Sequence, residues 1–104
     1  MNDTFTNNPA MQAHAAKAAS LLKALANEHR LMIMCTLIDG ELCVGDLNER
    51  VPLSQSALSQ HLASLREAGL VRTRKESQTV YYAVNGNEAS KIIAVLQSIY
   101  CPTA

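Results

Sequence analysis

Hydrophobic residues recur at helical spacing along most of the chain and alternate with polar residues only in one later stretch. The first segment is rich in Ala, Leu and Lys, which favour helix. In the second segment, apolar side chains share one stripe of a helix, formed by Leu31, Met34, Cys35 and Ile38. A short apolar pair at Val44 and Leu47, and a leucine face at Leu58, Leu62 and Leu65, continue this period. The pattern predicts four helices, over residues 10–25, 28–38, 44–50 and 54–68.

Residues that begin and end helices lie at the expected positions between these segments. Asn27 can cap the second helix, and Asp39-Gly40 ends it. Pro52 stops the third helix, and Ser54 can cap the fourth. Gly69 provides the C-terminal stop of the fourth helix. The third and fourth helices are therefore joined by a tight turn.

After Gly69 the period changes from helical to alternating. Residues 70–76 and 79–84 are rich in β-formers and are separated by a short polar turn, which predicts a β-hairpin. Residues 88–101 return to helical spacing, with apolar side chains around most of the circumference. A terminal helix that is apolar on so many sides in a small domain suggests a partner chain.

The element order α-α-α-α-β-β-α, with a tight turn and a basic hairpin, describes a winged helix-turn-helix, a mainly α fold with a β-hairpin wing. The chain has 104 residues, of which 48% are hydrophobic and 17% charged, enough for one folded domain. We expect this domain to span residues 10–101, with a disordered tail at 1–9 and a short tail at 102–104.

The composition also bears on where the protein acts. No apolar run approaches the length of a bilayer span, and the N-terminal sequence lacks a signal-peptide pattern, so we expect a cytoplasmic protein without membrane contact. The three cysteines are then buried hydrophobes, ligands or redox groups rather than structural disulfides.

Charge is balanced overall but unevenly distributed. The formal net charge is zero, which argues against indiscriminate nucleic-acid binding. Arg72, Arg74 and Lys75 nevertheless cluster on the hairpin, where a phosphate backbone or minor groove could meet them. The alternative is a solvated strand edge protected by positive charge.

The outward face of the fourth helix is small and polar, as a helix that enters the major groove requires. Gln60 offers a paired donor and acceptor to adenine, and Ser56 and Ser59 can serve bases or phosphates. Alone, this face would be read as an ordinary solvated helix; together with the turn and the basic hairpin, it favours binding to double-stranded DNA. The candidate DNA-binding residues are Ser54, Gln55, Ser56, Ser59, Gln60, His61, Arg72, Arg74, Lys75 and Gln78.

Three stretches carry a family resemblance. "LLKALANEHRLMIMCTL", "ELCVGDL" and "SQSALSQHLASLREAGLVRTRKESQTVYYAV" resemble the ArsR/SmtB family of winged-helix repressors, over roughly residues 18–101. The resemblance implies a homodimer joined by the first and last helices. It also implies repression of a nearby operon that an inducer relieves.

Metal sites of that family are incomplete in this sequence. One family site uses "ELCVCDL", but here Gly45 replaces the second cysteine, and Cys43 alone is a poor site for a soft ion. Another uses His and acidic side chains on the last helix, yet residues 86–101 contain no His. The three histidines of the chain are scattered, and each is interpreted as a surface or packing residue. Cys43 remains a weak metal or metalloid candidate.

Two other cysteines suggest a different inducer. The closest resemblance is to the BigR/HlyU-like subgroup, which has cysteines at the positions of Cys35 and Cys101. That resemblance implies a dithiol sensor of persulfides and other reactive sulfur species, in which a polysulfide bridge links the two thiols. Taken alone, Cys35 could equally be a small core hydrophobe.

Two further function classes stay open on the residues alone. A thiol enzyme has little support, because there is no Cys-x-x-Cys and no His placed beside a Cys in the sequence. A dimeric adaptor without DNA contact is the other alternative. We therefore expect a regulator that is not an enzyme and needs no cofactor.

Overall fold

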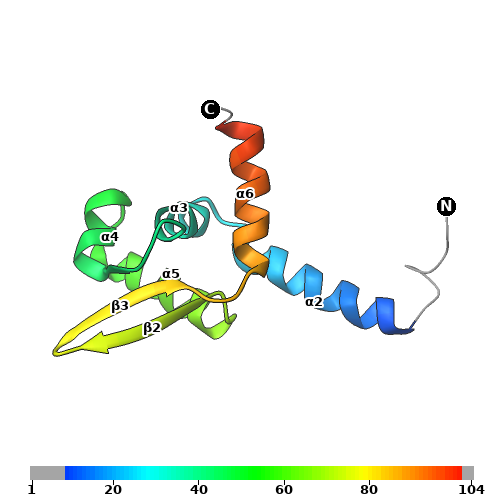
Figure 1. Cartoon of the computed structure of the whole chain (residues 1–104), viewed down its shortest axis with the longest axis horizontal. Helices are drawn as coiled ribbons and strands as arrows, with labels where there is room; N and C mark the ends of the chain where they lie inside the picture. The colour runs from blue at the N-terminus through cyan, green and yellow to red at the C-terminus, as the bar shows by residue number, and fades with distance from the viewer. Residues whose placement is uncertain (1–8, 102–104) are drawn as a thin grey trace.

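Five helices and a small antiparallel sheet form the fold of residues 9–101, which the computed structural model describes (Figure 1). In chain order the elements are α2 (Pro9–Leu25), α3 (Glu28–Leu37), β1 (Leu42–Cys43), α4 (Val44–Arg50), α5 (Gln55–Glu67), β2 (Val71–Glu76), β3 (Thr79–Val84) and α6 (Glu88–Tyr100). This order confirms the predicted winged helix-turn-helix. Helix α2 starts at Pro9, within the segment predicted as tail, because proline is tolerated in a first helical turn. Residues 1–8 and 102–104 lie outside the described residues.

The sheet has three strands rather than the predicted two. Strand β1 pairs antiparallel with β3, with Leu42 opposite Tyr82 and Cys43 opposite Tyr81. Strand β2 pairs with the other edge of β3, which gives the order β1-β3-β2. A strand of two residues has no alternating pattern, so β1 was not predictable from the sequence.

The core lies where α3, α4 and α5 meet one face of the sheet, with α6 packed against α3. It is built from aliphatic side chains and one methionine, and the fully buried large ones are Ile33, Met34, Leu37, Leu47, Leu58, Leu62, Leu65, Ile93 and Val51. The predicted leucine face of α5 is therefore confirmed. The predicted stripe of α3 faces the core as well: Met34 is fully buried, and the half-buried Leu31, Cys35 and Ile38 pack against the core.

Local signals fix the helix ends as the sequence predicted. The Asn27 side chain accepts hydrogen bonds from the backbone of His29 and Arg30 at the start of α3. Ser54 Oγ accepts from the backbone N–H of Ala57, 3.1 Å away, at the start of α5. Gly69 has φ +76°, a left-handed conformation that favours glycine, and it ends α5.

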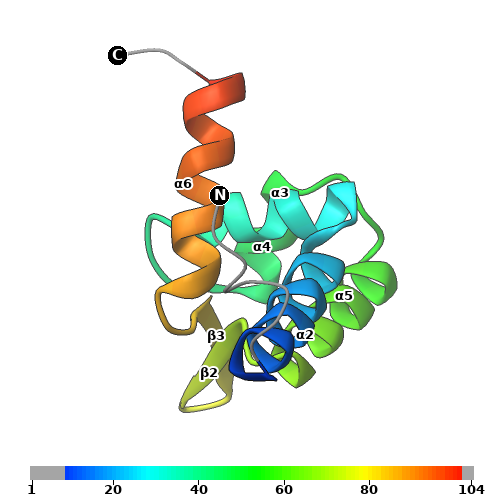
Figure 2. The same ribbon diagram turned by 90° about the vertical axis from the view of Figure 1, so that its right-hand side faces the viewer.

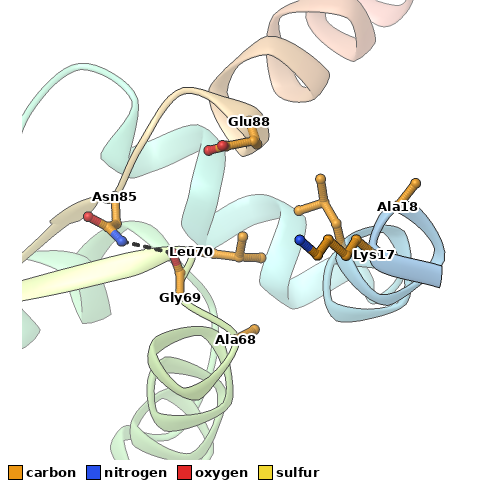
Figure 3. A pocket seen from close by; sticks show the side chains of 8 residues that line it. Lys17, Ala18, Ala68, Gly69, Leu70, Asn85 and Glu88 are labelled. Carbon is orange, nitrogen blue, oxygen red and sulfur yellow. Dashed lines mark hydrogen bonds between the residues drawn. The ribbon is translucent and has the colours of Figure 1, made fainter. Parts of the chain in front are cut away.

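Hydrogen bonds of Asn85 connect the segment before α6 to the segment after α5 (Figure 3). The Asn85 side-chain amide donates to the carbonyl oxygen of Gly69 at 3.0 Å. The backbone N–H of Asn85 donates to the carbonyl oxygen of Leu70 at 2.9 Å. Beside these hydrogen bonds is an open cavity of about 540 Å³, with Lys17 and Glu88 in its walls. Two hydrogen bonds thus join the segment that leads into α6 to the segment that follows α5.

Helices α2 and α6 extend from the body (Figures 1 and 2). Helix α2 packs on the core through its last turns, where Leu25 is buried, whereas residues 12–20 are exposed. Large apolar side chains on these two helices face solvent, with exposed fractions of 54% for Leu22, 58% for Val95, 58% for Ile99 and 77% for Tyr100. Within residues 9–101, no helix combines the length and the apolar character needed to cross a bilayer.

Candidate DNA interface and thiol site

Helix α5 presents the small polar face that the sequence predicted. Three leucines anchor its inner side, and Gln55, Ser56, Ser59 and Gln60 are exposed on the other side. The hydroxyl oxygen of Ser54 is already engaged in capping the helix. The side chains that are available to a base edge are therefore those of the exposed serines and glutamines.

His61 lies at the border of this face and is held by a second helix. Its Nδ1 accepts a hydrogen bond from Arg30 Nε at 3.2 Å, and Arg30 also donates to the carbonyl oxygen of Ala24 at 3.3 Å. The ring of His29 lies beside it, with 5.9 Å between centroids. Burial, followed by the charges of Arg30 and His29, lowers the pKa of His61, which favours the neutral ring. Because Nδ1 accepts the hydrogen bond from Arg30, the neutral ring carries its proton on Nε2.

The three-residue group at His61 was not predictable from spacing. The histidines are scattered along the sequence, but α3 and α5 bring His29 and His61 together. Arg30, on α3, therefore forms hydrogen bonds both with the C-terminal turn of α2 and with α5.

The wing exposes the predicted basic residues, but one of them is already paired. Arg72, Arg74 and Lys75 are exposed on β2, and Gln78 is exposed in the turn that follows. Arg74 Nε donates to both carboxylate oxygens of Glu41, each at 3.1 Å. These bonds raise the pKa of Arg74 and lower the pKa of Glu41. The pairing could not be found from the sequence, because Glu41 precedes β1, which the pattern did not show.

Cys35 and Cys101 line one cavity of about 210 Å³ between α3 and the end of α6. The other wall residues are Leu31, Leu96, Gln97 and Tyr100. Cys35 is half-buried and Cys101 is exposed, and both are free thiols. The sequence alone did not place these thiols near each other, because Cys35 is in α3 and Cys101 directly follows α6, far along the chain.

The environment of Cys35 favours its protonated form. Burial raises the pKa of the Cys35 thiol, and the nearby Cys101 raises it further, while a hydrogen bond with the Gln97 side chain opposes both. Cys101 is the more accessible of the two sulfur atoms. The pair therefore combines an open thiol with a sheltered one, an arrangement in which one sulfur can react with a reagent and the other can close a bridge.

Cys43 stands apart from this cavity. It is half-buried at the end of β1, where it is the N-cap residue of α4, and it lies opposite Tyr81. Among residues 9–101, no three His, Cys, Asp or Glu side chains are placed to share a metal ion. A Cβ atom at Gly45 would meet no atom within 4 Å, so the glycine that replaces the family's second cysteine is not required by packing.

Comparisons with known proteins agree with this geometry. The family model for bacterial regulatory proteins of the arsR family matches residues 27–73. HlyU from Vibrio cholerae, a transcriptional activator, is 57% identical over 91 residues, which are 88% of this chain and 84% of that protein. The solved structure of HlyU matches with a TM-score of 0.84 and is covered over 99% of its length.

Two further solved structures extend the comparison. The transcriptional repressor BigR from Xylella fastidiosa is 36% identical with a TM-score of 0.83, covering 92% of this chain and 98% of that one. A homodimeric winged helix-turn-helix DNA-binding domain from Mycobacterium bovis is 28% identical with a TM-score of 0.78, covering 91% and 88%. This chain therefore belongs to the ArsR family of winged-helix, DNA-binding transcriptional regulators, within the HlyU/BigR subgroup, and is not an enzyme.

Proposed function

We propose that this regulator binds operator DNA as a reduced homodimer and releases it when Cys35 and Cys101 react with persulfides or related reactive sulfur species. The observation that carries the proposal is the shared cavity, in which both thiols lie against an apolar wall. We also propose that the protein acts in the cytoplasm, the compartment that operator binding and a reduced dithiol would both require.

The sulfur chemistry can be written as successive thiol exchanges. The exposed Cys101 thiolate attacks the outer sulfur of a persulfide RSSH, so that RS⁻ leaves and Cys101 carries a persulfide. A second exchange adds one more sulfur and releases a second thiol. The Cys35 thiolate then attacks the sulfur next to the terminal –SH, and HS⁻ leaves. Two persulfides are consumed, and two thiols, one H₂S and a trisulfide bridge are formed.

The cavity suits this reagent better than a peroxide. Leu31, Leu96 and Tyr100 surround the thiols, and among residues 9–101 no charged side chain lines the wall. Peroxide oxidises a thiol to a sulfenic acid, and the only bridge that this acid can form with a second thiol is a direct disulfide, which requires the short geometry of an S–S bond. Inserted sulfur atoms lengthen the bridge, so a polysulfide can join thiols across a cavity without that constraint.

For DNA binding we assign α5 as the recognition helix and the hairpin as the wing. Gln60, Ser56 and Ser59 would contact base edges or adjacent phosphates, with Gln55, His61 and the N-terminal Ser54 beside them. On the wing, Arg72, Lys75 and Gln78 would meet the backbone or minor groove. The exposed charges of the wing would supply binding that depends on salt but not on sequence.

A bridge between the two cysteines would couple the cavity to DNA. It would pin α6 against α3, and α6 carries the exposed apolar residues Val95 and Ile99 that we assign to the dimer interface. Just before α6, Asn85 also donates a hydrogen bond to Gly69, which follows α5. A shift of α6 would therefore change the distance between the two recognition helices, which must match one turn of DNA.

The recognition role of Gln60 gives a direct prediction. Gln60→Ala should weaken operator binding by about 1–3 kcal/mol and reduce discrimination at one base pair, because a bidentate contact to adenine is lost. Gln12→Ala, an exposed change of the same kind on α2, is the control and should bind like wild type. Fluorescence anisotropy on the operator and on single-base variants measures both. Equal losses on every sequence would remove Gln60 from base recognition.

The sensor itself is tested with metal-free wild-type protein on the DNA upstream of its own gene. Anisotropy should report tight binding by the reduced protein, weaker binding after glutathione persulfide, and recovery with reductant. Binding that persulfide leaves unchanged, but that zinc or arsenite weakens through Cys43, would instead favour the metal-responsive alternative. Absence of binding in every state would contradict the assignment of this DNA as the operator.

A further inference from the structure

We infer that Glu41 limits the positive charge that the wing offers to DNA, because its carboxylate occupies the guanidinium of Arg74. This inference rests on the proposed DNA-binding role of the wing. It makes Glu41, a residue outside both the recognition helix and the hairpin, a determinant of how tightly the regulator holds DNA of any sequence.

The contacts of Arg74 account for its whole guanidinium group. Nε lies 3.1 Å from each oxygen of Glu41, and Nη2 lies 2.5 Å from one of them. The remaining nitrogen, Nη1, lies 3.3 Å from Glu76. The guanidinium carbon also lies 4.7 Å from the centroid of the Tyr81 ring. Arg74 is thus oriented by two carboxylates and one aromatic face.

A carboxylate and a phosphate compete for the same donors. Both accept paired hydrogen bonds from the fork of a guanidinium group. Glu41 therefore occupies Arg74 in the way that a DNA phosphate would. Because Arg74 and Glu41 are both substantially exposed, the pair is screened by water and can exchange, so it reduces the contribution of Arg74 without removing the residue from reach.

The charge balance of the wing leads to the same conclusion. Arg72, Arg74 and Lys75 carry three positive charges, and Glu41 with Glu76 carries two negative charges, which leaves a net charge of one. Arg72 also lies close enough to Glu41 for its positive charge to help lower the pKa of the Glu41 carboxyl. A wing with little net charge makes weak sequence-independent contacts and leaves more of the discrimination to α5.

Glu41 could instead serve only to hold the sheet together. It immediately precedes β1, and Arg74 is on β2, so the ion pair reaches across β3 where Tyr81 lies. A purely structural pair would, when broken, lower the melting temperature and weaken DNA binding. The charge-limiting role predicts the opposite change in affinity, which separates the two.

The test compares Glu41→Gln with Asp39→Asn, a control that removes one negative charge from the same loop, where Asp39 is exposed. Anisotropy titrations use the operator and an unrelated duplex over a series of salt concentrations, with thermal melts as a check on folding. Glu41→Gln should bind both duplexes more tightly at low salt, with a log–log salt slope steeper by about 0.9, the value for one added phosphate contact. Asp39→Asn should leave the slope unchanged.

Arg74→Ala completes a double-mutant cycle. It should change DNA binding little in the wild-type background but should abolish the gain in the Glu41→Gln background. An unchanged slope or weaker binding for Glu41→Gln, with wild type still binding DNA, would overturn the inference alone. Wild-type protein that binds neither duplex would overturn the proposed DNA role of the wing, and the inference with it.

Discussion

Protein carrying Cys101→Ser should remain on operator DNA after treatment with glutathione persulfide. After treatment, the affinity of wild-type protein for the operator should fall by about 5–150-fold, the range of a typical allosteric coupling. The affinity of the variant should not change. The reason is that Cys101 is the exposed thiol of the cavity, so without it no sulfur is delivered to the sheltered Cys35. Anisotropy before and after treatment measures the response.

Cys35→Ser should also prevent the release of DNA by persulfide, but at a later step of the reaction. The variant should acquire a persulfide on Cys101, visible by mass spectrometry as added sulfur, but should form no bridge and should stay bound to DNA. Cys43→Ser is the matched control, because Cys43 lies at the start of α4 outside the cavity, and it should respond like wild type. Full DNA release by Cys35→Ser would show that a bridge is not needed and would contradict the proposed coupling.

The pKa of Cys35 adds a pH dependence to this reaction. Because burial and Cys101 raise that pKa, Cys35 is mostly protonated at neutral pH, and only its thiolate closes the bridge. Bridge formation in wild type should therefore accelerate as pH rises from neutral towards the pKa of Cys35. Rapid quenching followed by mass spectrometry gives the rate, and a bridging rate that falls over this range would contradict the assignment of Cys35 as the closing thiol.

Ile99→Asp should convert the proposed homodimer into monomers and abolish tight operator binding. Ile99 and Val95 form an exposed apolar face on α6, and Leu22 presents a similar side chain on α2. A carboxylate buried in such an interface would lose its hydration without gaining a partner. A monomer would then contact only one half-site of a two-fold symmetric operator.

Light scattering during gel filtration measures the mass of this variant, and anisotropy measures its affinity. Ala94→Asp is the control, since Ala94 is exposed on the same helix but points well away from Ile99. The control should remain dimeric. A dimeric Ile99→Asp with wild-type affinity would place the interface on another surface.

The parts of the fold that were predictable are those fixed by local periodicity and local caps. The leucine face of α5, the cap at Ser54 and the stop at Gly69 are all encoded within a few residues, and the structure agrees with each. The helix-to-strand change after Gly69 was equally clear, because a period of two replaces a helical period there. Together these signals defined the winged helix-turn-helix.

The contacts that were not predictable are those made between distant segments. The stripe of α3 was incomplete, because Ile33 and Leu37 lie outside it and are also buried, where α3 meets α5, α6 and β3. The pairing of Arg74 with Glu41 depends on a strand too short to leave a pattern. The proximity of Cys35 to Cys101 depends on how α6 packs beside α3, so only the family resemblance suggested it.

The sparse packing of α2 bears on the lifetime of the chain. Residues 12–20 are exposed in a single copy, so opening this helix locally disturbs little of the core. A protease would therefore reach α2 before any other described helix, whereas a partner that covers the helix would shield it. Degradation would then fall most heavily on unpaired copies, and turnover of the regulator would slow as its concentration rises.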